Sequence, residues 1–461
     1  MAAFGKRAPS DASPPPPLTV VPGGQAATPM GTGLSRGTAA ASTDVIRDQV
    51  LLRIEPAVAV RMTQMDLSVR VSALVSEIAT ESKLLLNRQE QQSLAHDIVD
   101  DMVGLGPLEP LLRDSTVSDI LINGASMVYV ERRGRLELSS VKFRHNAHVL
   151  HVAQRIASSV GRRVDESSPM LDARLADGSR VNVVIPPLSL KGPCISIRKF
   201  SKGAMEFPKL IQYGSMSREM GRALEIAARS RLNIIISGGT GSGKTTLLNA
   251  LSSMIEPTER IITIEDAAEL QLQQPHVIQL ETRPPNIEGH GQIAQRDLVH
   301  NALRMRPDRI ILGEVRGPEA FDMMQAMNTG HDGSMSTIHA NSGRDALARI
   351  ENMMLMANVN LPIRAIRGQM ASALDMVVQT ARMRDGVRRV TEVVEVAGLE
   401  GDVFSLNPLF TFKYMGENVD GTLRGAFEPS NLRPRFLPRL EYFGLADAFM
   451  AALTPLKAAA T

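Results

Sequence analysis

Hydrophobic residues recur at different spacings in successive parts of the chain. Between residues 44 and 103, apolar residues such as Val71, Val75 and Ile78 lie three or four positions apart, a spacing typical of amphipathic helices. Residues 1–43 show no such period and are rich in Pro, Ala, Gly, Ser and Thr. The pattern therefore predicts a disordered tail followed by a helical module. That module is expected to be a packed bundle, with docking to a membrane surface or a partner as the alternative.

Residues 104–203 predict an α+β domain, because short β-rich runs surround a helical stretch near His148 to Val160. The dipeptides Asn123-Gly124 and Asp177-Gly178 are typical turn signals. The β-rich runs are Ile120–Ile122, Val128–Val130, Val181–Ile185 and Ile195–Ile197.

Residues 204–461 alternate apolar strand-like runs with helical segments, which is typical of a mostly parallel α/β sheet. The last part departs from this pattern. There, Asp385-Gly386 joins two extended runs and predicts an antiparallel hairpin.

Composition narrows the class of protein. A chain of 461 residues is expected to form two or three domains, and 43% apolar residues are enough for real cores. No apolar stretch approaches the roughly 18 residues needed to cross a bilayer, so a cytoplasmic location is expected. Cys194 is the only cysteine, which excludes an internal disulfide and a cysteine-based zinc cluster. A net charge of +2, 3% aromatics and no Trp disfavour a groove for single-stranded nucleic acid.

A glycine-rich loop carries the strongest chemical signal. The apolar run Leu232 to Ile236 leads into this loop, and a helical stretch begins at Thr246. Glycines let consecutive backbone N–H groups converge on phosphates, Lys244 reaches the β and γ oxygens, and Thr245 can bind Mg²⁺. The sequence predicts ATP and Mg²⁺ as ligands. The candidate nucleotide-binding residues are Gly239, Thr240, Gly241, Ser242, Gly243, Lys244, Thr245 and Thr246.

Two later apolar runs end in carboxylates, at the strand ends where ligands collect in open α/β sheets. Ile261–Ile264 is followed by Glu265, and Arg309–Leu312 by Gly313 and Glu314. Hydrolysis needs a carboxylate to orient water and help hold the metal. Gly313 stands where many P-loop enzymes have Asp, so the work is expected to be divided between the two glutamates, with exposed strand-end acids as the alternative. The candidate metal ligands are Thr245, Glu265 and Glu314.

Two histidines bracket the short run from Ser334 to Ile338. Either His331 or His339 could hydrogen-bond the γ-phosphate or an acid and so report the nucleotide state. The alternative for each is an ordinary satisfied polar group. Metal ligation is disfavoured, because no Cys or third His stands at ligand spacing.

Taken together, these blocks resemble the secretion and pilus-assembly ATPase superfamily, and most closely its CpaF-like branch, which powers Tad, or type IVc, pili. The order of the blocks supports the resemblance: Walker A, an acidic box (Thr263 to Asp266), Walker B (Gly313 to Gly317) and a histidine box (Thr329 to His339). Further matching stretches are Gly104 to Glu109, Val117 to Gly124, Arg304 to Arg309 and Pro434 to Leu437.

The resemblance implies a RecA-like ATPase domain and a hexameric ring with nucleotide between the N-terminal and C-terminal domains. In this superfamily Glu265 looks like the water-activating acid and Glu314 like the Walker B acid. Counter-charges for the γ-phosphate are expected from the preceding domain or from a neighbouring subunit. Arg174, Arg180 and Arg198 match arginine-bearing positions of the family pattern, with solvated surface arginines as the alternative.

Three functions are therefore weighed. The first is a motor that assembles or retracts a pilus through an inner-membrane platform protein, acting at the cytoplasmic face of the inner membrane. The second is an ATPase that energises type IV secretion of DNA or protein. The third is a nucleotide-gated interaction module with little turnover. Two strand-end acids disfavour the third, and the low aromatic content disfavours DNA threading.

Overall fold

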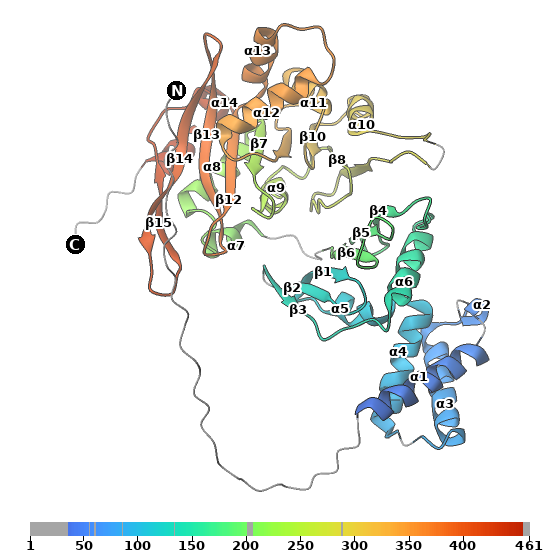
Figure 1. Cartoon of the computed structure of the whole chain (residues 1–461). Helices are drawn as coiled ribbons and strands as arrows, with labels where there is room; N and C mark the ends of the chain where they lie inside the picture. Colours follow the sequence, from blue (N-terminus) through green and yellow to red (C-terminus); the bar gives the residue numbers. More distant parts are fainter. Residues whose placement is uncertain are drawn as a thin grey trace, which may run out of the picture. The chain divides into compact units, whose positions relative to one another are not determined.

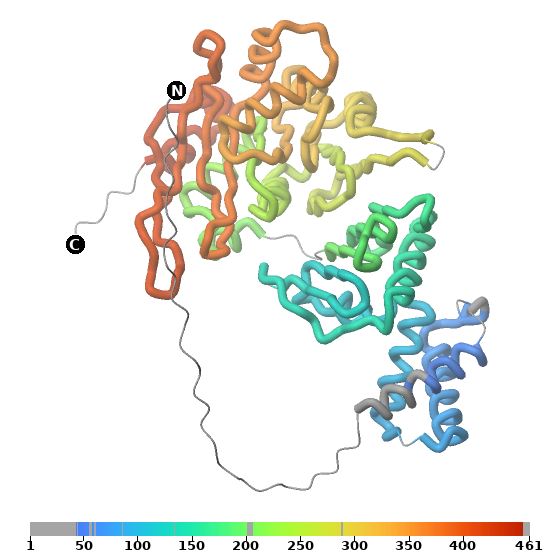
Figure 2. The backbone as a smooth tube through the Cα atoms, viewed as in Figure 1, coloured from blue at the N-terminus to red at the C-terminus, as the bar shows by residue number. Residues whose placement is uncertain are grey.

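The computed structural model describes residues 36–454, except 55, 60, 85, 133, 201–205 and 287–288. The chain divides into two compact units, Met1–Gly104 and Leu105–Thr461. Figure 1 labels their elements, and Figure 2 traces the backbone in the same colours. Residues 1–35 of the predicted tail lie outside the described residues, and residues 36–43 form the start of a helix.

The first unit is helical, as the three-to-four spacing predicts. Its helices bury an apolar stripe that includes Val71, Val75 and Ile78, each 0% exposed. Thr63 and Asn87 cap the N-termini of the third and fourth helices by accepting hydrogen bonds from the backbone N–H groups of Asp66 and Glu90. The helices are α1 (Arg36–Arg53), α2 (Pro56–Ala59), α3 (Gln64–Glu81) and α4 (Arg88–Val103).

The second unit begins with an antiparallel sheet whose order is β3-β2-β1-β6-β5-β4. Alternate residues of its strands pack on helix α6, which confirms the α+β prediction. The elements are η1 (Gly106–Leu108), α5 (Glu109–Arg113), β1 (Val117–Asn123), β2 (Val128–Arg132), β3 (Arg135–Leu138), α6 (Asn146–Ser159), β4 (Met170–Arg174), β5 (Arg180–Val184) and β6 (Cys194–Arg198). We call this sheet, β1 to β6, the small sheet.

The same unit contains a second sheet, which we call the large sheet, with the order β15-β14-β13-β12-β7-β11-β10-β8-β9. Its strands are β7 (Ile234–Gly238), β8 (Ile261–Glu265), β9 (Val277–Glu281), β10 (Arg309–Leu312), β11 (Met335–Ile338), β12 (Met376–Arg382), β13 (Arg388–Glu400), β14 (Val403–Glu417) and β15 (Leu423–Pro429). Strands β12 to β9 in that order are parallel, whereas β13, β14 and β15 are antiparallel. The predicted hairpin at Asp385-Gly386 is confirmed between β12 and β13.

Helices lie against the large sheet, and separate apolar clusters pack on its two faces. Burial on both faces explains why its strands read as continuous apolar runs. The helices are α7 (Phe207–Gln212), α8 (Arg218–Arg229), α9 (Lys244–Ser252), α10 (Gln295–Ala302), α11 (Glu319–Asn328), α12 (Gly343–Leu355), α13 (Ile363–Ala373), α14 (Leu437–Tyr442) and α15 (Ala446–Leu453). The predicted division between residues 203 and 204 stays a prediction, because both sheets lie in one unit.

The strand order determines which candidate site residues lie close together. Strand β11 lies between β7, which precedes the glycine-rich loop, and β10, which precedes Glu314. This arrangement is that of a RecA-like sheet, as expected. The start of β10 is fixed by Arg309, which is 0% exposed and forms two hydrogen bonds with the Glu259 carboxylate, of 2.7 and 2.8 Å. Such paired burial satisfies both charges.

Among the described residues, none of the helices combines the length and the apolar character needed to cross a membrane.

Candidate active site

The glycine-rich loop connects β7 to the N-terminus of α9. Gly241 (φ 69°) and Gly243 (φ 98°) adopt left-handed backbone conformations that favour glycine. At Gly238, an added Cβ would lie 2.4 Å from the hydroxyl oxygens of Ser242 and Thr380, so this strand end is closely packed. The Lys244 Nζ donates to the carbonyl oxygens of Gly238 and Gly239, at 3.0 Å each. The loop therefore offers a backbone cradle with a cation beside it.

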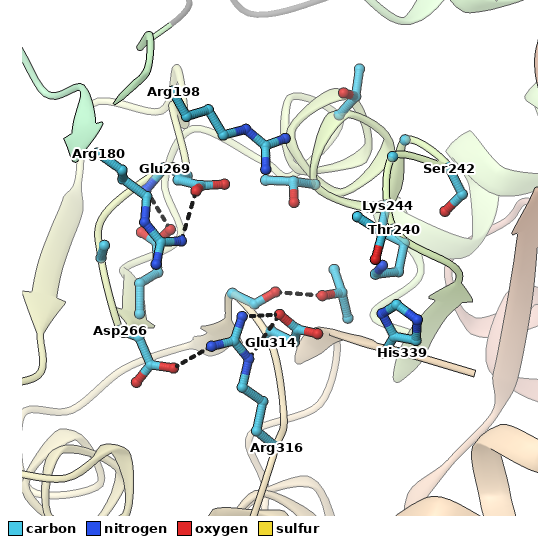
Figure 3. A pocket seen from close by; sticks show the side chains of 18 of the residues that line it. Arg180, Arg198, Thr240, Ser242, Lys244, Asp266, Glu269, Glu314, Arg316 and His339 are labelled. Atoms are coloured by element: carbon cyan, nitrogen blue, oxygen red, sulfur yellow. Dashed lines mark hydrogen bonds and ion pairs between the residues drawn. The ribbon is translucent and has the colours of Figure 1, made fainter. Parts of the chain in front are cut away.

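A cavity of about 310 Å³ opens in front of this loop (Figure 3). It collects most of the residues predicted from sequence. These are Thr240, Gly241, Ser242, Gly243, Lys244, Thr245, Thr246, Glu265, Glu314, His339, Arg180 and Arg198. Burial lowers the pKa of Lys244, but the nearby Glu314 carboxylate opposes that effect. Residues from the strand ends, from the glycine-rich loop and from the small sheet therefore line one cavity.

Glu265, the last residue of β8, is 3% exposed. Its Oε2 accepts hydrogen bonds from the backbone N–H groups of Glu269 (2.7 Å) and Leu270 (2.9 Å). Its Oε1 is buried without a hydrogen-bond partner in the described part of the chain. Burial raises the pKa of Glu265 to about 7, although the two backbone hydrogen bonds lower it. The carboxylate is therefore held rigidly, with one oxygen ready to accept a proton near neutral pH.

Gly313 follows β10 at the position where many P-loop enzymes have an acid, and its neighbours show why no side chain fits there. Ile264 on β8 lies opposite Leu312 on β10, so Gly313 follows beside Glu265. A Cβ at Gly313 would lie 2.8 Å from the Glu265 Cγ. The glycine leaves room for the carboxylate side chain that the neighbouring strand supplies. An Asp in this place would collide with it.

Glu314 lies in the same cavity but in a different environment. Its side chain is 25% exposed, and its Oε2 accepts from the Arg316 Nε (2.9 Å) and Nη2 (2.5 Å). Arg316 also contacts Asp266, with 3.3 Å between Nη1 and Oδ2, as Figure 3 shows. The arginine therefore neutralises Glu314 and occupies one of its two oxygens.

The two histidines lie at opposite ends of β11. His339 follows the strand and lines the nucleotide cavity. His331 precedes Ser334 and β11, and it is not among the residues that line the cavity. Ligands collect at the carboxyl ends of parallel strands, and His339 lies at that end of β11, whereas His331 lies before its other end. The structure does not bring His331 to the candidate site.

The three arginines form a row across neighbouring strands of the small sheet, because Arg174 pairs in register with Arg180 and Arg180 with Arg198. Arg180 and Arg198 line the nucleotide cavity, whereas Arg174 lines an adjoining cavity of about 710 Å³. Arg174 forms an ion pair with Glu281 (3.0 Å), and Arg180 forms one with Glu269 (3.0 Å).

Sequence reasoning did not single out several residues that line the cavity, among them Gln295, Arg316 and Arg388. Arg316 stands within the Walker B block, where its charge next to Glu314 was a usable signal. Arg388 follows the β12–β13 hairpin and donates from Nε to the Gly241 carbonyl oxygen, at 2.9 Å. Nothing in the local sequence around Gln295 or Arg388 indicates contact with a loop so distant along the chain.

These residues fit a nucleoside triphosphate. The glycine cradle and α9 N-terminus match phosphate oxygens, and Lys244, Arg180 and Arg198 match their charge. No group of three or more His, Cys, Asp or Glu side chains within the described ranges could hold a metal alone. Mg²⁺ usually binds through one or two protein oxygens together with phosphates, and Thr245 and Glu314, which carry such oxygens, line the cavity.

The RecA-like sheet order, the phosphate cradle and the strand-end carboxylates define a P-loop ATPase. The family model for "Type II/IV secretion system protein" matches residues 101–395, and the chain belongs to that family. It is 37% identical to a Mycobacterium tuberculosis protein named "Putative conjugal transfer protein", over 66% of this chain and 87% of that protein. It is 32% identical to the type IV secretion system protein VirB11 of Bartonella henselae, covering 65% and 95% of the two chains.

Among solved structures, the VirB11 ATPase from the Brucella suis type IV secretion system, in complex with sulphate, matches with 28% identity and a TM-score of 0.34. That match covers 63% of this chain and 95% of the other.

Proposed function

We propose that the chain is an ATP-driven motor subunit of a secretion machine. Mg-ATP binds between the glycine-rich loop and the small sheet, and hydrolysis changes the attraction between that sheet and the large sheet. The observation that supports this most strongly is that Arg180 and Arg198, carried by the small sheet, line the same cavity as Lys244.

The charges suggest how turnover produces movement. Arg180 pairs with Glu269 in the structure, and the γ-phosphate of ATP would compete for it as a more highly charged acceptor. Loss of that phosphate would return Arg180 to Glu269. Bound Mg²⁺ would neutralise charge on the β and γ oxygens. Thr245 and Glu314 are its candidate ligands, and Glu265 is assigned to the attacking water.

Two machines remain candidates, and the names of the relatives favour type IV secretion of protein or DNA. The second candidate is a Tad pilus motor, which the motif resemblance favours, notably Gly104 to Glu109 and Pro434 to Leu437. In either case we propose a homo-hexamer that acts with inner-membrane platform proteins at the cytoplasmic face of the membrane.

Substitution of Lys244 by Ala tests the ATPase assignment. The variant should lose Mg-ATP binding or turnover, because Lys244 is the loop's cation for the β and γ phosphates. Phosphate release would be measured beside Lys209→Ala, which removes an exposed lysine outside the cavity. Turnover of Lys244→Ala close to wild type would refute the assignment.

Mass measurement with and without ATP tests the ring. A mass of six chains is expected in ATP, and a strict monomer at micromolar concentration would refute the hexamer. To separate the two machines, cells that carry only the Lys244→Ala protein would be examined for surface fibres and for transfer of protein or DNA. Loss of fibres alone would favour the pilus motor, and loss of transfer alone would favour secretion.

A further inference from the structure

Gln295 is buried in the wall of the nucleotide cavity without a full set of partners. It is the first residue of α10, and the whole residue is 6% exposed. Its Oε1 has no hydrogen-bond partner among the described residues. Leaving a buried amide oxygen unpaired is unfavourable, because the oxygen loses its hydrogen bond to water and gains none in return. A partner from outside the chain, bound in the cavity, would remove this cost.

The helix that carries Gln295 is firmly anchored. The backbone N–H of Ala294 donates to the Asp297 carboxylate at 2.9 Å, which caps the helix. Arg296 Nε donates to Asp322 Oδ2 at 2.8 Å, and His300 Nε2 lies 2.7 Å from the other oxygen of the same carboxylate. These contacts join α10 to α11. The backbone of α10 therefore holds the first residue of the helix, Gln295, beside the cavity that it lines.

Glu265, a second residue that lines the same cavity, also has an unpaired oxygen. Glu265 Oε1 is buried and unpartnered, and α10 packs against β8, the strand that ends at Glu265. Two acceptors in one cavity wall suit a molecule with two hydrogens to donate. We propose that Gln295 and Glu265 together hold the attacking water, so that the water donates one hydrogen to each Oε1 and its lone pair faces the γ-phosphorus.

This assignment rests on the proposed ATPase function and deepens it. The water oxygen bonds to the γ-phosphorus, the bond from that phosphorus to the β–γ bridging oxygen breaks, and the proton passes to Glu265. ADP and inorganic phosphate leave, with atoms and charge conserved. Gln295 accepts no proton, since a neutral amide is a poor base, so it acts by positioning. A glutamine that orients water is an established solution in other P-loop enzymes.

Replacement of Gln295 by Met tests the proposal, because Met has a similar length and no amide. The kcat should fall by about 100-fold with an unchanged KM for ATP, since the contact orients the nucleophile only. Calorimetry should show weaker binding of Mg-ADP with aluminium fluoride, which mimics the transferring phosphoryl group, and unchanged binding of Mg-ADP. The melting temperature of the nucleotide-free protein should stay the same or rise, because an unpaired buried group is removed.

Gln369→Met is the matched control. Gln369 on α13 also has an unpartnered buried Oε1, but it does not line the cavity, so kcat should not change. If Gln295→Met does not fold, Gln295→Asn keeps the amide and withdraws it from the water, and the same loss of kcat is expected.

Equal loss of affinity for Mg-ADP with and without aluminium fluoride, or a lower melting temperature with unchanged kcat, would overturn the proposal. Failure of the ATPase function itself would be recognised separately. In that case wild type would release no more phosphate than Lys244→Ala.

Discussion

The ends of β8 and β10 carry the same kind of side chain in two different environments. Glu265 is 3% exposed, held by two backbone N–H groups, and keeps one oxygen unpaired. Glu314 is 25% exposed on its side chain and bound by Arg316. The buried carboxylate is suited to accept a proton, and the neutralised one is suited to help hold a cation once Arg316 is displaced. Environment, and not residue type, separates their roles.

The largest expected effect comes from Glu265→Gln. The variant should bind Mg-ATP with wild-type affinity and hydrolyse it about 1000-fold more slowly, because loss of a general base costs that much. Calorimetry and phosphate release measure the two quantities. Normal hydrolysis would transfer the water-activating role to Glu314 and reverse the comparison.

Gly313→Ala should have the next largest effect. The added Cβ would lie 2.8 Å from the Glu265 Cγ, so the carboxylate must shift. A displacement of about 1 Å in a catalytic group can cost about 100-fold in kcat. Overpacking should also destabilise the fold by about 1–3 kcal/mol, measurable by denaturant unfolding. Gly368→Ala is the control, because an added Cβ there meets nothing within 4 Å. Unchanged kcat in Gly313→Ala would show that the position of Glu265 does not matter.

A smaller effect is expected from Glu314→Gln. If Glu314 helps to hold the metal, turnover at low Mg²⁺ should fall about 10- to 100-fold and recover in part as Mg²⁺ is raised. Glu265→Gln should show no such recovery. A loss in Glu314→Gln that is independent of Mg²⁺ would remove the distinction between the two acids.

The pH dependence sharpens the same comparison. Only the ionised Glu265 can accept a proton, and burial raises its pKa from 4.5 to about 7. The kcat/KM should therefore rise about tenfold per pH unit below that pKa and level off above it.

Because the folded protein binds the extra proton between pH 4.5 and about 7, the contribution of Glu265 to stability falls as pH rises through that window. The stability of Glu265→Gln should not show this fall with pH. If wild type and Glu265→Gln have the same dependence of stability on pH, Glu265 is not the group responsible.

Local patterns predicted much of this site, because the glycine-rich loop and both acids follow directly from the strands that carry them. Parallel strands bring their carboxyl ends to one edge, so Lys244, Glu265 and Glu314 could be grouped before the fold was known. Residues that arrive from a different element could not be grouped in this way. Gln295 comes from the start of α10, and Arg388 comes from the far side of a hairpin.

His331 is the opposite case, a residue that was predicted from sequence but does not line the cavity. The carboxyl-end rule also favours His339 over His331, but it applies only if the run from Ser334 to Ile338 is a parallel strand of the same sheet, which the pairing of β11 with β7 shows. The role of Gly313 likewise depends on register. Sequence shows a missing acid there, whereas the pairing of Leu312 with Ile264 shows that Glu265 takes the space.

A crystal structure with Mg²⁺ and a non-hydrolysable ATP analogue tests the central claim most directly. The analogue should lie in the glycine cradle, with a water within about 3 Å of the Glu265 Oε1 and facing the γ-phosphorus. A water held by Glu314, with the Glu265 carboxylate turned away from the phosphates, would contradict the assignment.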